Sequence, residues 1–184
     1  MSYPTITCPT GCNNDVPAIN MDECNPSVDF SEVDKLYMTA APDGCGLSDW
    51  TSAAEWATRI DNAGVAICDI REWWVSGELP EPERNITPID NEREVSSPMT
   101  FGLNLQVFDL DTDTYDALRI LQCGLKVRIW YSAGGYMYGS TDGIEASVIA
   151  SHIVTKGSKE VNYGQLLIKW EADHNPERID NPLA

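Results

Sequence analysis

The cysteines are the residues of this chain best suited to metal or redox chemistry. They are Cys8, Cys12, Cys24, Cys45, Cys68 and Cys123. Cys8 and Cys12 flank Pro9-Thr10-Gly11 and resemble half of a zinc knuckle, but the spacer has three residues and no second close pair follows. A tetrahedral zinc site would therefore have to recruit Cys24 and Cys45 across long gaps.

A disulfide is the second alternative for these cysteines, and free thiols are the third. The sequence favours free thiols, because a cytosol keeps cysteines reduced. Cys68 and Cys123 lie in apolar contexts that are typical of small core residues. We therefore predict no metal and no cofactor.

The acids of Asp109–Asp113 alternate as they do in a calcium-binding EF-hand loop. Such a loop needs Gly at its sixth position and Glu at its twelfth, and Thr114 and Ile120 occupy these positions. The same residues suit the start of a helix, where an N-cap and acids in the first turn are favourable. We predict a helix that is capped by Thr112 or Asp113.

Catalytic signatures are absent from the chain. It contains no GxSxG, P-loop, GxGxxG or HExxH motif, and its two histidines, His152 and His174, have no paired signature. His152 is predicted to be a strand histidine with a structural role. The many carboxylates follow no spacing rule that would identify a hydrolytic pair. The prediction is a protein that is not an enzyme, with a cytosolic hydrolase as an alternative.

The chain is strongly acidic. Asp and Glu number 29 against 12 Lys and Arg, which gives a net charge of -17. This charge repels nucleic acid and anionic membrane surfaces, and it suits a basic protein partner. No apolar run reaches the roughly 18 residues of a membrane span. Residues 1–20 do not have the pattern of a signal peptide, so we expect folding in a cytosol.

The centre of the chain, Gly124–Ala150, predicts a three-stranded antiparallel meander. Residues 125–131 alternate between an apolar face and a face with Lys126, Arg128 and Trp130. Glycine-containing turns then lead into strands at 136–138 and 144–150. Further strands are predicted at 36–38, 65–75, 101–107 and 166–170.

Two helices are predicted to pack against these strands, at about 48–61 and 113–123. Ser48-Asp49 offers the first N-cap. The predicted buried stripes are Trp50, Ala53, Ala54, Ala57 and Ile60 in the first helix and Tyr115, Leu118 and Leu121 in the second. Trp56 falls at the edge of the first stripe and is expected to pack on a sheet.

The remaining segments set the domain organisation. Residues 1–34 predict an extended N-terminal arm, 35–173 a β-rich domain, and 174–184 a C-terminal arm, because the two ends have prolines and no periodicity. A proline-rich loop at 77–98 is predicted to make contacts, with a hairpin as the alternative. The fold class is mainly β: a sandwich or open barrel, mostly antiparallel, with two short helices and extended arms.

Four aromatic residues are the candidate interface: Trp73, Trp74, Tyr136 and Tyr138. Aromatic side chains dominate the buried centres of interfaces, although packing within the core is an equal alternative for them. Trp73 and Trp74 point to opposite faces of a regular strand, so one of them should be exposed or covered by another chain. A carbohydrate-binding module would instead place all four rings on one platform.

Four segments resemble structural proteins of bacteriophage virions, in particular small virion proteins of crAss-like phages that infect gut Bacteroidetes. They are Ser48–Ile60, Leu118–Tyr131, Tyr138–Ile144 and Ile168–Arg178. The resemblance implies a β-rich, non-catalytic subunit of a capsid, head fibre, neck ring or tail, which is assembled in the host cytoplasm and located in the virion. Other virion proteins and copies of this chain would be its partners.

Overall fold

The structure is a computed structural model. It describes residues 32–40, 45–60, 68–83, 86–90, 93–96, 98–154 and 162–184, and for 86–90 and 93–96 it describes the backbone alone. The predicted N-terminal arm therefore lies outside the described residues, apart from 32–34. So do Cys8, Cys12 and Cys24, three of the four cysteines that a zinc site would have to recruit.

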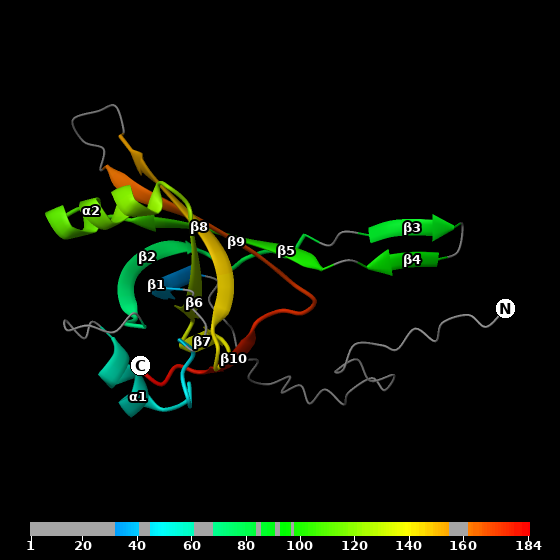
Figure 1. Cartoon of the computed structure of the whole chain (residues 1–184), viewed down its shortest axis with the longest axis horizontal. Coiled ribbons are helices and arrows are strands. Elements are labelled where there is room, and N and C mark those ends of the chain that lie inside the picture. Colours follow the sequence, from blue (N-terminus) through cyan, green and yellow to red (C-terminus); the bar gives the residue numbers. More distant parts are fainter. Residues whose placement is uncertain are drawn as a thin grey trace, which may run out of the picture.

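A ring of six antiparallel strands forms the body of the protein (Figure 1). In ring order the strands are β1 (Glu32–Ala40), β2 (Arg71–Glu78), β5 (Met99–Val107), β9 (Tyr163–Ala172), β8 (Ile144–Ile153) and β6 (Leu125–Ala133). β1 pairs with both β2 and β6, and this closes the ring that the predicted open barrel would leave open. The prediction of a mainly antiparallel β fold with two short helices is confirmed.

The interior of the ring is the main hydrophobic core. Period-two burial is clear in β5, where Phe101, Leu103, Leu105 and Val107 are buried as predicted. Aromatic rings meet across the strands in this core: Phe101 stacks on Trp170 with ring centroids 5.2 Å apart. Successive side chains of a strand point to opposite faces, so the alternation of apolar and polar residues gives the strand one buried face.

One edge of β6 is shared by two strands. Its first half, Leu125–Ile129, pairs with β8, and its last three residues pair with β7 (Tyr136–Gly139). Trp130 lies between the two pairings. Gly139 and Gly143 let the intervening turn approach its indole ring, because a Cβ on either glycine would lie within 2.7 Å of a ring atom.

Trp130 belongs to the face that alternation marks as polar, yet it is fully buried. The reason is a second hydrophobic cluster on the outside of β1 and β6, which α1 (Ala53–Arg59) covers (Figure 1). Trp56 is fully buried there, with ring centroids 5.3 Å from Tyr37 and 5.4 Å from Trp130. The prediction that Trp56 packs on a sheet is confirmed.

Helix α1 is shorter than the predicted 48–61, and its buried face differs. Ser52 is the N-cap, and the carboxylate of Glu55 accepts hydrogen bonds from the backbone N–H groups of Ser48 and Asp49. This holds Ser48 and Asp49 in a turn before the helix. The predicted alanine stripe is wrong, because the helix is oriented by Trp56 and leaves Ala53, Ala54 and Ala57 exposed.

Cys45 and Cys68 form a disulfide, which corrects the prediction of free thiols for this pair and of a core residue for Cys68. Arg59 reinforces the same junction: its guanidinium donates to the backbone carbonyls of Cys45, Gly46 and Cys68 at 2.8–3.2 Å. The pairing is tertiary, because the two cysteines lie 23 positions apart and are brought together by the neighbouring strands β1 and β2.

Helix α2 (Thr112–Leu121) lies at one end of the ring and buries Leu118 and Leu121, as predicted (Figure 1). Tyr115 is exposed instead, and Cys123 is exposed after the helix end rather than in the core. The N-cap is Asp111, not Thr112 or Asp113: its side chain accepts from the N–H of Thr114 at 2.7 Å. The Asp111 carboxylate therefore caps a helix, which agrees with the prediction that the acids of Asp109–Asp113 begin a helix.

Two segments differ from their predicted form. The loop at 77–98 contains a hairpin of β3 (Ile86–Asp90) and β4 (Arg93–Ser96). The C-terminal segment contains β10 (Glu177–Asp180), which pairs with β7, and its Ile179 and Leu183 pack against the second cluster. The C-terminal arm is thus held on the body of the protein by hydrogen bonds and apolar contacts.

Candidate functional site

The two adjacent tryptophans of β2 lie on opposite faces, as their alternation predicts. Trp73 is half-buried and packs against the interior core. Trp74 faces outward with 68% of its surface exposed, the largest exposed fraction among the large hydrophobic residues that the structure describes. Trp74 is therefore the predicted interface residue that remains available for a partner.

Lys35 organises the surroundings of Trp74. Its ammonium lies 4.3 Å from the centroid of the indole ring and 2.7 Å from the carboxylate of Glu72. The Tyr37 hydroxyl also donates to Glu72, at 3.4 Å. Burial, together with the charge of Glu72, raises the pKa of Tyr37. The exposed ring thus rests on a cation that a carboxylate holds in place, which limits the conformations of this part of the surface.

The tyrosines of β7 are positioned differently. Tyr138 stacks on Tyr131, with ring centroids 5.0 Å apart, and packs against the interior core. Tyr136 lies beneath the guanidinium of Arg178, 4.4 Å from its ring centroid. Strand register places Trp73, Leu36, Tyr131 and Tyr138 in one row on the interior face. Trp74 is on the opposite face, so the four candidate residues do not form a single platform.

The β3–β4 hairpin is the second surface with potential for contacts. Its two strands pair with each other and form a separate sheet, and Figure 1 shows them extending away from the ring. At the base of the hairpin, Glu83 and Thr100 exchange backbone hydrogen bonds of 2.9 and 3.0 Å. The hairpin is the alternative that the sequence allows for this loop. The signal that favours it is the presence of strand-forming residues, Thr87, Ile89 and Val95, on either side of Asn91.

The described part of the chain has neither a metal-binding cluster nor a membrane-spanning helix. It holds no group of three or more His, Cys, Asp or Glu side chains that could bind a metal ion. None of its helices is long and apolar enough to cross a membrane. His152 lies on β8 and makes an edge-on contact with Tyr115, with ring centroids 5.5 Å apart.

No protein-family profile matches the chain. No curated protein matches it at a significant level. The functional argument therefore depends on the residues and surfaces described above.

Proposed function

We propose that this protein is a non-enzymatic structural subunit of a bacteriophage virion, which acts through contacts with copies of itself and with other virion proteins. The observation that carries the proposal is the β3–β4 hairpin, which pairs with no strand of the ring among the described residues. An isolated two-stranded hairpin is marginally stable in water. A neighbouring subunit that packs on it would supply the missing contacts.

Two further features support a contact function. Trp74 presents a large ring that Lys35 and Glu72 hold in place, and such rigid aromatic side chains are typical of interface centres. The net charge of -17 favours basic partners. The C-terminal segment adds no such support, because β10 is paired with β7.

A carbohydrate-binding function has less support. It requires several rings on one exposed platform, and Trp73 and Trp74 lie on opposite faces of β2. Trp74 alone would remain as a sugar-stacking ring. A hydrolase would need two carboxylates that converge in a pocket with separate roles as acid and base.

The first experiment measures oligomerisation of the full chain by mass photometry. We expect species at multiples of 20.3 kDa. A variant in which residues 84–97 are replaced by two glycines removes only the hairpin strands, so it should keep the melting temperature of the full chain and form monomers. Trp74→Ala should weaken self-association without changing the melting temperature, and exposed Ile149→Ala is the matched control.

The second experiment addresses the virion itself. Mass spectrometry of particles purified from the phage that encodes this chain should detect the protein at a fixed ratio to the major capsid protein. A chain that stays monomeric at all concentrations, or that is present in infected cells and missing from purified particles, would contradict the proposal.

A further inference from the structure

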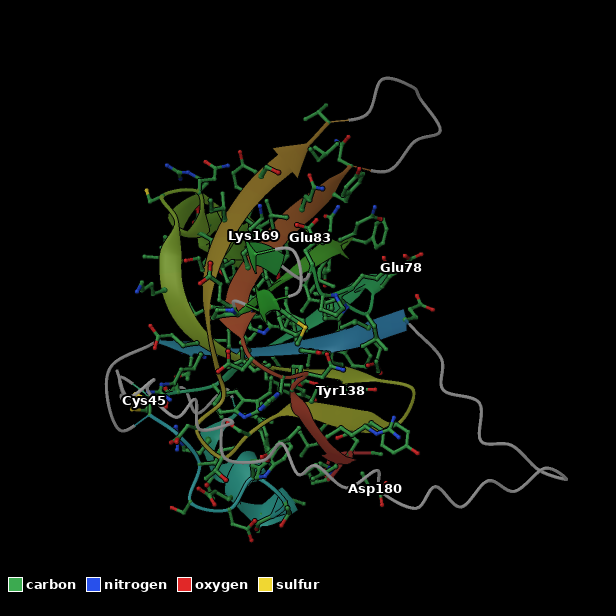
Figure 2. The ribbon with its side chains drawn as sticks, turned by 90° about the vertical axis from the view of Figure 1, so that its right-hand side faces the viewer. Cys45, Glu78, Glu83, Tyr138, Lys169 and Asp180 are labelled. Carbon is green, nitrogen blue, oxygen red and sulfur yellow. A yellow bond between two sulfur atoms is a disulfide. The ribbon has the colours of Figure 1, made fainter. Side chains whose placement is uncertain are left out.

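The disulfide between Cys45 and Cys68 joins the two ends of the segment that carries α1. This segment follows β1 and precedes β2 in the chain, and Figure 2 shows Cys45 just beyond the end of β1, where the chain continues to α1. Trp56 is the buried side chain of the helix and packs in the second hydrophobic cluster. The disulfide therefore closes the loop that covers the outside of β1 and β6.

Hydrogen bonds hold the two cysteines together independently of the disulfide. The guanidinium of Arg59, in the last turn of α1, donates to the backbone carbonyl of Cys45 at 3.0 Å and to that of Cys68 at 2.8 and 3.2 Å. The N–H of Ile70 donates to the Arg59 carbonyl at 2.9 Å, which holds Arg59 beside the start of β2. Because a charged donor makes strong hydrogen bonds, this bridge should keep the two side chains adjacent when their sulfurs are not bonded.

The two cysteines differ in their accessibility to solvent. Cys45 is fully buried, whereas Cys68 is partly exposed. In thiol–disulfide exchange a thiolate must reach a sulfur atom of the other molecule. A dissolved thiol or disulfide can therefore react at Cys68, while Cys45 is shielded from it. Cys123 is exposed as a free thiol and lies outside this pair.

We propose that Cys68 is a redox-reactive site, and that the Cys45–Cys68 disulfide forms and opens in the folded chain by exchange with low-molecular-weight disulfides and thiols. The Cys68 thiolate attacks one sulfur of the dissolved disulfide and displaces a first thiolate. The Cys45 thiolate then attacks the Cys68 sulfur of the mixed disulfide and displaces a second. The two cysteines are oxidised, the dissolved disulfide is reduced to two thiols, and these take up the two protons that the cysteines lose.

This chemistry makes the attachment of the α1 segment depend on the redox state of its surroundings. A reducing cytosol keeps such a pair as thiols, and there Arg59 and the buried Trp56 hold the segment in place. In an oxidising compartment the disulfide adds a covalent closure. The inference goes beyond the proposed virion function and does not depend on it, because it concerns the chemistry of a single chain.

Trapping with oxidised glutathione tests the order of the two steps. The full chain is first reduced, and its circular dichroism spectrum should remain that of a folded β protein. After incubation with oxidised glutathione, mass spectrometry of proteolytic fragments locates the products. In Cys45→Ser, Cys68 should accumulate as a mixed disulfide with glutathione, and in Cys68→Ser, Cys45 should remain a thiol. The adduct on exposed Cys123 is the internal standard in both variants.

Two results of the trapping experiment would overturn the inference. The first is a reduced chain that is unfolded in buffer, because the disulfide would then have to form before the fold. The second is a glutathione adduct on Cys45 in Cys68→Ser that forms as fast as the adduct on Cys68 in Cys45→Ser. Neither result bears on oligomerisation or on the presence of the protein in virions, so failure here is distinguishable from failure of the proposed function.

Arg59→Lys tests whether Arg59 positions the two cysteines. Lysine keeps the charge but lacks the planar fork that reaches both carbonyls, so the equilibrium constant for disulfide formation with glutathione should fall about tenfold. The formation of the mixed disulfide at Cys68, measured with Cys45→Ser present, should be unchanged. Arg119→Lys, on exposed α2, is the control and should change the equilibrium constant less than about twofold. An unchanged constant in Arg59→Lys, or an equal loss in both steps, would contradict the positioning role.

Discussion

Gly143→Ala is the substitution for which the structure makes the sharpest stability prediction. Gly143 has a φ of +74°, and a Cβ at this position would lie 2.7 Å from Cζ2 and 3.0 Å from Cε2 of Trp130. The indole cannot move away easily. It is fully buried, its Nε1 donates to the Ser140 carbonyl at 2.7 Å, and its ring centroid is 5.4 Å from that of Trp56.

Two costs add in this variant. A residue with a side chain in the left-handed region costs about 1 kcal/mol relative to glycine, and displacing a packed core ring costs about 2 kcal/mol. Gly124→Ala is the matched control, because Gly124 also has a φ of +74° but its Cβ would meet Ile149 at an ordinary 3.7 Å. The control should therefore lose about 1 kcal/mol and Gly143→Ala about 3 kcal/mol.

Urea denaturation followed by tryptophan fluorescence, with the disulfide intact, measures both free energies of unfolding. The expected difference between the two variants is about 2 kcal/mol, or about 4–8 °C in melting temperature for a chain of this size. Similar m-values would show that both variants unfold in the same transition. If the two variants agree within about 0.5 kcal/mol, the packing of this turn against Trp130 does not stabilise the fold as argued.

Three further predictions concern the disulfide and the titrating groups. Cys45→Ser/Cys68→Ser should lower the free energy of unfolding by about 3 kcal/mol, because the disulfide closes a loop with a sequence separation of 23; a loss below about 1 kcal/mol in denaturant would contradict this. The backbone N–H of Thr114 at the start of α2 lowers the pKa of Asp111, so the stabilisation by the ionised carboxylate is present above the unfolded-state pKa near 4 and is lost as the pH falls. In Asp111→Asn the free energy of unfolding should therefore fall less steeply with decreasing pH. An unchanged pH profile would argue against the cap. Burial raises the pKa of Tyr37 and Tyr131, so the stabilisation by the neutral phenols is complete below about pH 10 and is lost as the pH rises further. Ultraviolet titration should show both phenols ionising only with alkaline unfolding. Titration of all seven tyrosines in the folded state would disprove this prediction.

Much of the strand framework was predictable because burial in a sheet imposes a period of two. The alternation in 101–107 identifies β5 and its buried face, and the glycine-containing turns place β6, β7 and β8 in order. Helix α2 was found from Leu118 and Leu121 at helical spacing. These features depend on neighbours along the chain, so the sequence records them directly.

The candidate site was predictable only in part. Alternation requires one of Trp73 and Trp74 to be exposed, and it does not say which, because that depends on which face of β2 meets the core. Tyr138 was proposed as a contact residue, and it stacks on Tyr131 because β7 pairs with the end of β6.

The β class, the acidic surface and most strand positions follow from the sequence, because local periodicity and composition encode them. The burial of Trp130 on a nominally polar face depends on tertiary contacts, since α1 comes from another part of the chain to cover it. The pairing of Cys45 with Cys68 depends on them as well. Both outcomes depend on which distant segments become neighbours when the ring closes, and no spacing within one segment records that.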